Sequence, residues 1–382
     1  MKQIVCLATS PWYPIPTRKQ QVMSRIPDAE ILYFDPSITY IAPLKDKSAK
    51  PGLTAYQKPG VHPQANITVY SLPPVLPFFY KFRWINKLNQ RRMARFVRKK
   101  MQEHGFSDAV LWVYSPVTVD LVDYVPHKGL VYDCVDRHSA YGGLMDPALV
   151  DAMELELAGK TDMTFATADA LAERLRAAQP ETVMIPNGAN FERFVQASRP
   201  QPVPDDLAGI PHPIFGFVGA LQSCIEYDYL EAAAKARPDW HFVLIGKEKP
   251  GVDLSALHAM QNVHFLGLKP NEQLPQYLAH FDACLNLFAK SNLSKDVSPL
   301  KFYEYLATGR PIVSTKQPDQ ILQYAPLIEI ADSPAEFISA CEAALHDDTP
   351  ERTAARIEAG RACSWDSRVS QMCSLLQEHE IL

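Results

Sequence analysis

Glycine is scarce in this chain of 382 residues, which has 16 glycines against 32 prolines and no G-x-G-x-x-G sequence. Without that motif, a dinucleotide-binding site has no support from the sequence. The chain also lacks an apolar run long enough to span a membrane, and its start, MKQIVCLATSPWYP, is broken by proline too early for a signal sequence. We therefore expect a cytoplasmic protein without a membrane span.

Cysteine pairs of the kind that bind metals are missing as well. The seven cysteines are scattered without a C-x-x-C pair, and several lie in apolar strand patterns. This distribution argues against a zinc site and a disulfide framework, and it indicates reduced, packed thiols. Because no D-x-D pair is obvious either, we expect an activity that requires no metal and no other cofactor.

Short apolar runs alternate with helical patterns along the whole chain. This alternation is typical of a parallel sheet with helices on its faces, so the predicted fold class is α/β. The predicted strands of the first half are 1–10, 30–34, 67–71, 109–113, 130–132, 163–166 and 183–185. Those of the second half are 214–218, 239–246, 263–267, 283–287, 312–314 and 327–330.

A proline-rich stretch, Gln196–Pro213, separates the two halves. It contains five prolines and has little periodicity, as expected of a linker. The length of the chain suits two domains of ordinary size. We expect a first domain over 1–195, a linker over 196–213, a second domain over 214–362 and a terminal segment over 363–382.

The stretch Asn292–Thr315, NLSKDVSPLKFYEYLATGRPIVST, gathers ionisable groups where a loop meets a helix. Ser298 suits the N-cap and Pro299 the first helical position, so a helix is predicted from Pro299 to Thr308, stopping at Gly309.

The start of this predicted helix is a candidate anion site. The amides of Leu300 and Lys301 find no partner inside the helix, and the positive end of the helix dipole lies beside the Lys301 ammonium. This arrangement favours a phosphate or diphosphate. Glu304, on the same face and one turn further, can accept from hydroxyls of the molecule that carries the phosphate, although a solvated Lys301 and Glu304 pair on an ordinary helix would show the same spacing.

The spacing Asp296-x7-Glu304, followed by YLATGRPIV, resembles the donor-binding segment of GT-B glycosyltransferases of the group 1 (family 4-like) type. The S-P-L-K-F-Y-E variant is similar to bacterial cell-envelope and exopolysaccharide transferases. The resemblance implies that Glu304 holds the ribose hydroxyls of a nucleotide sugar, that Asp296 faces the transferred sugar, and that Lys301 contacts the donor phosphate or a sugar acid.

The same resemblance implies the architecture of the whole chain. It predicts two Rossmann-like domains that face each other across a cleft, the first binding the acceptor and the second the nucleotide sugar. It also predicts a C-terminal helix, within 363–382, that crosses back to the first domain.

Further donor contacts are expected at strand ends of the second half. Gly216 and Gly219 allow a tight passage after the strand 214–218, and Gly219 lies where relatives approach the donor diphosphate. The basic residue that many relatives place in this loop is absent, which leaves phosphate neutralisation to Lys301 and Lys247. Lys247 ends a buried strand and suits either a phosphate or an exposed turn.

Candidate acceptor and acid/base residues follow strands of the first half. Arg18 resembles the remnant of an R-P-Q-Q-type sequence, although a solvated charge at a helix start is equally consistent. Asp133, Asp136 and His138 follow the strand 130–132, and two carboxylates beside a histidine can move protons. We assign Asp136 and His138 as catalytic candidates, and Arg18 and Asp133 as acceptor contacts.

The segment Pro73–Lys100 is strongly basic, with nine basic and no acidic residues from Lys81 onward and an aromatic cluster near its start. A basic helix headed by aromatic residues suits an anionic membrane surface. Nucleic acid is disfavoured because no recognised motif accompanies the patch. A helix face that packs on the sheet remains the alternative. The predicted membrane contacts are Trp84, Arg91, Arg92, Arg95 and Arg98.

Together these features predict a glycosyltransferase that moves a sugar from a nucleotide diphosphate sugar, with UDP favoured, to a glycan or lipid-linked glycan acceptor. We expect it to act in bacterial envelope or exopolysaccharide synthesis, with retention of configuration, at the inner face of the cytoplasmic membrane. A GT-B epimerase or hydrolase and a non-catalytic nucleotide-sugar-binding subunit remain alternatives. The sequence does not identify the sugar, the base, the acceptor or the oligomeric state, and a base role for Asp136 would imply inversion.

Overall fold

The computed structural model describes residues 1–290 and 294–382. The chain divides into two compact units, Met1–Pro186 together with Val369–Leu382, and Asn187–Arg368. The expected domain boundary after residue 195 lies inside the second unit. Residues 292 and 293, which open the predicted donor stretch, lie outside the described residues.

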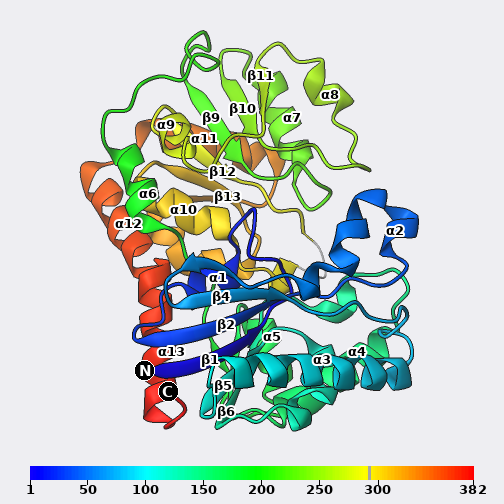
Figure 1. Cartoon of the computed structure of the whole chain (residues 1–382). Helices are drawn as coiled ribbons and strands as arrows, with labels where there is room; N and C mark the ends of the chain where they lie inside the picture. The colour runs from blue at the N-terminus through cyan, green and yellow to red at the C-terminus, as the bar shows by residue number, and fades with distance from the viewer. Residues whose placement is uncertain (291–293) are drawn as a thin grey trace. The chain divides into compact units, whose positions relative to one another are not determined.

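The first unit is built on an eight-stranded sheet with the order β3-β4-β2-β1-β5-β6-β7-β8 over the described residues. Neighbouring strands are parallel, except that β3 runs antiparallel to β4. Figure 1 shows the earliest strands in blue. The strands are β1 (Lys2–Leu7), β2 (Ala29–Asp35), β3 (Val61–Gln64), β4 (Ile67–Ser71), β5 (Ala109–Val113), β6 (Gly129–Cys134), β7 (Met163–Ala166) and β8 (Val183–Met184).

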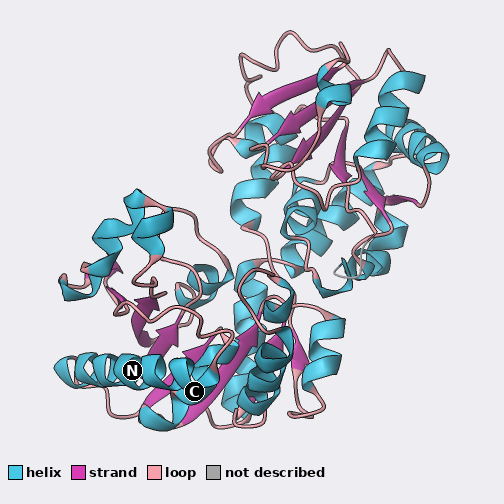
Figure 2. Cartoon of the chain, turned by 90° about the vertical axis from the view of Figure 1, so that its right-hand side faces the viewer, coloured by secondary structure: helices cyan, strands magenta, loops and turns pink. Residues whose placement is uncertain are grey.

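Helices connect these strands and cover the sheet. The α-helices are α1 (Arg18–Met23), α2 (Ala42–Lys45), α3 (Arg83–Glu103), α4 (Pro147–Ala158) and α5 (Asp169–Leu175), and the final helix α13 (Trp365–Glu378) enters this unit at Val369. Short 3-10 turns are η1 (Lys47–Leu53), η2 (Ala55–Gln57), η3 (Pro116–Asp120), η4 (Val122–Tyr124) and η5 (His138–Ala140). Both views place the two chain termini near each other in this unit (Figures 1 and 2).

The second unit has a six-stranded sheet with the order β11-β10-β9-β12-β13-β14 among the residues described. All of its pairings are parallel, so it follows the doubly wound order of a Rossmann sheet. Figure 2 shows its strands in magenta with helices around them. The strands are β9 (Ile214–Val218), β10 (His241–Ile245), β11 (Val263–Gly267), β12 (Ala283–Asn286), β13 (Ile312–Thr315) and β14 (Glu329–Ala331).

Helices cover both faces of this second sheet. Apolar residues of α7, α8 and α11 form one core with the strands, and residues of α6, α9 and α10 form the other. The elements are α6 (Phe191–Phe194), η6 (Val195–Ser198), α7 (Tyr227–Ala236), α8 (Ser255–His258), α9 (Leu274–Leu278), η7 (Ser294–Asp296), α10 (Leu300–Thr308), η8 (Asp319–Leu327), α11 (Pro334–His346) and α12 (Pro350–Ala362).

The α/β prediction is confirmed, and each predicted strand is present within a few residues of its predicted bounds. The sequence did not indicate β3, because Val61–Gln64 is an edge strand that is largely exposed and contains a proline, so it has no apolar alternation. Within the described part of the chain, no helix is both long enough and apolar enough to cross a membrane.

Candidate functional site

A cavity of about 210 Å³ lies at the carboxyl ends of β9 and β12 in the second unit. The connections from these neighbouring strands leave in opposite directions, toward β10 and toward β13. In doubly wound sheets this switch point is where ligands bind. The loop after β9, the end of β12 and the first turn of α10 line the cavity.

Helix α10 begins one residue later than predicted. Pro299 is the N-cap and Leu300 the first helical residue, so the prediction that Ser298 caps this helix is wrong. The Ser298 hydroxyl instead accepts from the backbone N–H of Asn187 at 2.9 Å, and the Asn187 side chain donates to the Ser298 carbonyl at 3.2 Å. Gly309 ends the helix at a φ of 74°, a conformation that suits glycine.

Ser298, Pro299, Leu300 and Lys301 all line the cavity, so the predicted anion site opens onto it. The first amides of α10 have no partner inside the helix. The Lys301 ammonium lies at the same helix end and 5.9 Å from the centre of the Phe194 ring. The helix end and the ammonium together make this side of the cavity positive.

Lys301 and Glu304 form an ion pair in this structure, with 2.6 Å between Nζ and Oε2. Their side chains are 28% and 10% exposed, so the pair is shielded from water more than an ordinary surface pair. Glu304 lies one turn beyond the cavity lining. Asp296, the other acid of the predicted pair, lies in η7 and is buried.

Gly219 lies in the cavity lining, and its N–H donates to the carbonyl of Ile245. A side chain on the neighbouring Gly246 would place its Cβ 1.7 Å from the Gly219 oxygen, so the ends of β9 and β10 approach as closely as glycine allows. Lys247 follows directly, but its side chain is exposed and does not line the cavity. The structure therefore favours the exposed-turn interpretation of Lys247.

The sequence reasoning missed several residues at this cavity. The Tyr305 hydroxyl donates to the carbonyl of Val218 at 3.3 Å and accepts from its N–H at 2.8 Å, which fixes α10 against the end of β9. Burial raises the pKa of Tyr305 well above its usual range, so the phenol stays protonated. Asn286 at the end of β12 also lines the cavity and donates to the Ser314 hydroxyl. The sequence does contain a signal for Asn286, because it is a polar residue that directly follows the apolar residues of β12.

In the first unit, Arg18 and Asp133 pair with each other. Arg18 Nε donates to both carboxylate oxygens of Asp133, at 3.1 and 2.9 Å, and Arg18 Nη1 donates to the Pro186 carbonyl at 3.0 Å. Their side chains are 2% and 0% exposed. The two residues hold each other in the interior, while Arg18 Nη2 has no hydrogen-bond partner among the described residues, and their role as acceptor contacts stays a prediction.

Asp136 and His138 differ in accessibility. Asp136 is exposed and accepts from the Tyr141 hydroxyl at 2.9 Å. His138 is buried, and its Nε2 lies 3.1 Å from the carbonyl of Tyr114, so this nitrogen carries the proton. Burial lowers the pKa of His138, which keeps the ring neutral near pH 7. Asp136 is thus the more accessible of the two predicted catalytic groups.

Lys19 is a further charged residue at this place that the sequence did not indicate. It is buried, its ammonium lies 5.5 Å from the centre of the Tyr114 ring, and the carboxylate of Asp136 acts on it. Burial lowers the pKa of Lys19, while Asp136 opposes that shift. Its neighbour Arg18 belongs to a sequence that resembles a known motif, whereas a single lysine at the start of a helix has no sequence pattern that predicts its burial.

The basic helix α3 is amphipathic, with one face in the core and one in solvent. Trp84 is 63% exposed, and Arg91, Arg92, Arg95 and Arg98 are all exposed. Two of the arginines are held by tyrosines, Arg91 by the Tyr124 hydroxyl at 3.2 Å and Arg92 by the Tyr40 hydroxyl.

The remaining two arginines of this exposed face carry free charges. Within the described part of the chain, Arg95 and Arg98 make no hydrogen bond or ion pair. All five predicted membrane residues are thus on the surface, which corrects the alternative in which Trp84 packs on the sheet.

Known proteins resemble this chain in sequence and in fold. Residues 212–347 match the family described as Glycosyl transferases group 1. Over 257 residues, 63% of this chain, the sequence is 26% identical to TuaH of Bacillus subtilis strain 168, which is named as a teichuronic acid biosynthesis glycosyltransferase. The match covers 64% of that relative, which is less than two thirds of its length.

Solved structures share the fold along the whole chain. Sucrose-phosphate synthase from Thermosynechococcus elongatus has a TM-score of 0.69 at 14% identity over 99% of both chains. An E. coli structure described as trehalose-6-phosphate bound with UDP-2-fluoro glucose has a TM-score of 0.71 at 12% identity over 100% of both chains. Residues 212–347 therefore form a group 1 glycosyl transferase domain, and the chain has the GT-B glycosyltransferase fold, as the sequence predicted.

Proposed function

We propose that the chain is a glycosyltransferase that moves a sugar from a nucleotide diphosphate sugar, preferably a UDP-sugar, to a glycan or lipid-linked glycan in bacterial envelope or exopolysaccharide synthesis. The group 1 domain and the likeness to TuaH support the reaction class and the envelope context. The UDP-2-fluoro glucose in the E. coli structure of the same fold supports UDP as the nucleotide of the donor.

One observation carries this proposal. The positive end of α10, with Lys301 beside it, opens onto a cavity at the switch point of the group 1 domain. A departing nucleoside diphosphate gains negative charge as the sugar leaves, and fixed amides with an ammonium stabilise that charge best in the transition state. In this proposal Lys301 and the amides supply the positive charge, so the reaction requires no metal.

The Lys301 and Glu304 pair gives the donor site a closed resting state. A bound diphosphate attracts the Lys301 ammonium away from the carboxylate, and Glu304 is then free to accept from ribose hydroxyls. The exchange replaces one ion pair with two ligand contacts. Asp296 faces the transferred sugar, which is transferred with retention of its anomeric configuration.

The exposed face of α3 attaches the enzyme to the inner face of the cytoplasmic membrane. Trp84, Leu88, Arg91, Arg95 and Arg98 follow one another at spacings of three and four along this face, so they form one stripe on the helix. Each basic group near an anionic surface contributes about 1 kcal/mol, and the indole suits the headgroup region. The stripe places the enzyme where lipid-linked acceptors are found.

A thermal-shift panel of UDP, GDP, dTDP and their sugars tests the donor site. We expect UDP compounds to raise the melting temperature of the wild type and to have a much smaller effect on Lys301→Ala. Lys235→Ala is the matched control, because Lys235 also pairs with a helical glutamate, Glu231, but lies outside the cavity lining. If no nucleotide stabilises the protein, the donor assignment is wrong.

Two further measurements address the chemistry. The anomeric configuration of the product, followed by NMR from the first turnovers, distinguishes retention from inversion. Transfer in the presence of a chelator should equal transfer without it, whereas a loss that added Mg²⁺ or Mn²⁺ restores would contradict the metal-independent reaction.

A further inference from the structure

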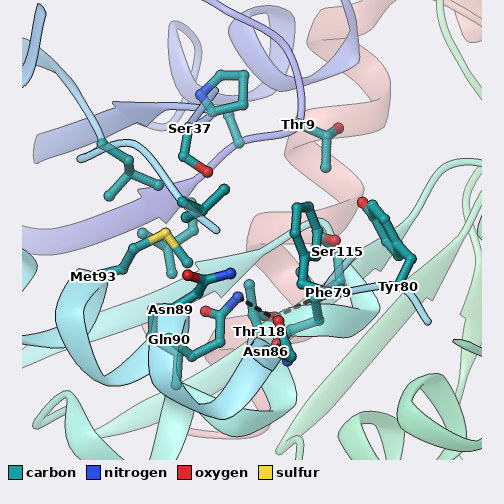
Figure 3. Close-up of a pocket in the computed structure, with 17 residues that line it drawn as sticks. Thr9, Ser37, Phe79, Tyr80, Asn86, Asn89, Gln90, Met93, Ser115 and Thr118 are labelled. Carbon is teal, nitrogen blue, oxygen red and sulfur yellow. Dashed lines mark hydrogen bonds between the residues drawn. The ribbon is translucent and has the colours of Figure 1, made fainter. Parts of the chain in front are cut away.

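The first unit has a cavity of its own, of about 130 Å³, at the carboxyl ends of β1 and β5 (Figure 3). Connections from β1 lead toward β2, and those from β5 lead toward β6 on the other side, so this cavity also lies at a switch point. The predicted acceptor residues Arg18 and Asp133 do not line it. It is therefore a second candidate ligand site with a different set of residues.

The lining of this cavity is uncharged. Among the described residues around it there is no lysine, arginine, histidine or carboxylate. Leu72, Val75, Phe79, Met93 and Leu121 give it largely apolar walls. A phosphate or acidic group would lose its hydration there without gaining a partner, so the occupant is an uncharged group with an apolar body.

Three amides of α3 lie together at one side of the cavity, as Figure 3 shows. Asn86 Nδ2 donates to the Val117 carbonyl and to Asp120, both at 2.8 Å. Those two bonds fix Asn86 Oδ1 as an acceptor, and Gln90 Nε2 donates to it at 3.2 Å. The orientation of the Gln90 amide is therefore set by the network behind it.

The other end of this amide, Gln90 Oε1, is left without a hydrogen-bond partner among the described residues. Gln90 is 1% exposed and lies in the lining of the cavity. A buried carbonyl that lacks a donor costs free energy, which a bound hydroxyl or amide N–H would recover. On another side of the cavity, the hydroxyls of Thr9 and Ser37 also make no hydrogen bond within the described chain (Figure 3).

The cavity wall is continuous with the exposed aromatic segment before α3. Phe79 and Tyr80 line the cavity, while the flanking Phe78 and Phe82 are 42% and 44% exposed. Phe78 has a φ of 65°, a left-handed conformation that aromatic residues rarely adopt. This turn directs neighbouring rings to opposite sides, one outward and the next into the cavity.

We propose that this cavity binds an uncharged amphiphile, a lipid alcohol or glycolipid, whose apolar segment enters between the walls and whose hydroxyl or amide N–H donates to Gln90. The inference rests on the proposed function and deepens it, since it names the class of acceptor. The basic stripe and the exposed aromatics on α3 hold the mouth of the site at an anionic membrane, and α3 contributes its inner face to the ligand and its outer face to the lipid surface.

Calorimetric titration of the whole chain with octyl β-D-glucopyranoside below its micellar concentration tests the proposal. Methyl β-D-glucopyranoside, which has the same head without the chain, is the paired probe. We expect saturable binding of the octyl compound and binding at least about tenfold weaker for the methyl compound, because the chain provides the apolar contact. Equal binding of the two glucosides would overturn the amphiphile assignment.

Variants locate the binding. Gln90→Met keeps the length of the side chain and removes its amide, and we expect about tenfold weaker binding of the octyl glucoside. Gln102→Met is the control, because Gln102 is exposed on the same helix. Val75→Phe fills the cavity and leaves the amides untouched, and it should abolish binding. If neither Gln90→Met nor Val75→Phe weakens binding, the site is not this cavity.

UDP titration of the same samples separates this proposal from the donor assignment. Variants of the amphiphile site should bind UDP as the wild type does, which also shows that they are folded. Wild-type protein that binds octyl glucoside but no nucleotide would contradict the proposed function and leave the amphiphile site standing. Protein that binds UDP but not octyl glucoside would contradict the amphiphile site and leave the proposed function standing.

Discussion

Two pairs of opposite charge that the sequence indicated have very different surroundings. Lys301 and Glu304 of the second unit are 28% and 10% exposed, and Lys301 lines a cavity. Arg18 and Asp133 of the first unit are 2% and 0% exposed, and Arg18 also holds the carbonyl of Pro186. A charge pair that a ligand can open suits binding, whereas a pair buried in the interior suits positioning of the chain. The first pair should therefore govern binding and the second the fold.

The largest effect is expected from breaking the buried pair. Arg18→Ala leaves the Asp133 carboxylate buried without its partner, and it should lower the free energy of unfolding by about 3–5 kcal/mol. Urea unfolding followed by circular dichroism measures this. Arg25→Ala is the control, because Arg25 lies two residues beyond the end of α1 and is only partly buried. If Arg18→Ala keeps full stability, the pair does not position the chain.

A change in the Lys301 and Glu304 pair should break function and spare the fold. Lys301→Ala removes the ammonium that stabilises the leaving diphosphate, and it should lower kcat/KM for transfer about 100- to 1,000-fold. Asp296→Ala and Glu304→Ala are expected to act in the same direction, with unfolding in urea close to that of the wild type. A protein whose biological activity tolerates all three changes is a binding subunit and not a transferase.

The surface charges of α3 form a third class, which neither the fold nor the donor site requires. Neutralising Arg91, Arg92, Arg95 and Arg98 together as glutamines should weaken flotation with anionic liposomes at least about tenfold, since each contributes about 1 kcal/mol. UDP binding and stability should change little. Flotation that stays the same with all four changed would end the membrane proposal.

The smallest effect is a dependence of stability on pH. Burial lowers the pKa of His138 in the folded chain below its usual value of 6.5. The unfolded chain thus binds a proton that the folded chain does not, so stability should fall as pH drops through about 6.5 and recover above it. His138→Asn should flatten this part of the curve of unfolding free energy against pH. A wild-type curve that rises as pH falls through this range would contradict the assignment.

The contrast between the units also explains which residues the sequence could indicate. The donor-side residues Ser298 to Glu304 are consecutive or one helical turn apart, so local spacing alone brings them together. The first-unit cavity combines the ends of β1 and β5 with the inner face of α3, and no local pattern relates these segments. Gln90 in particular looked like one polar residue on a basic helix.

Burial was the property that the sequence judged least well. Arg18 and Asp133 follow strands and look like residues of a crevice. In the structure they pair with each other in the interior, although they are 115 positions apart in the sequence. Lys247 has the same kind of position after β10 but is exposed. Whether a charged side chain at a strand end faces a cavity, the solvent or another charge depends on distant segments, which periodicity does not describe.

The sequence by itself determined the α/β class, nearly all of the strands, the helix start that carries Lys301 and the basic face of α3, because each depends on residues close together in the chain. Only the tertiary structure decided that Ser298 bonds Asn187 instead of capping α10 and that Arg18 pairs with Asp133 inside the first unit. It also decided that the Gln90 carbonyl, beside an apolar cavity, has no partner among the described residues. The physical reason is that hydrogen-bond partners and burial are set by the packing of segments far apart in sequence.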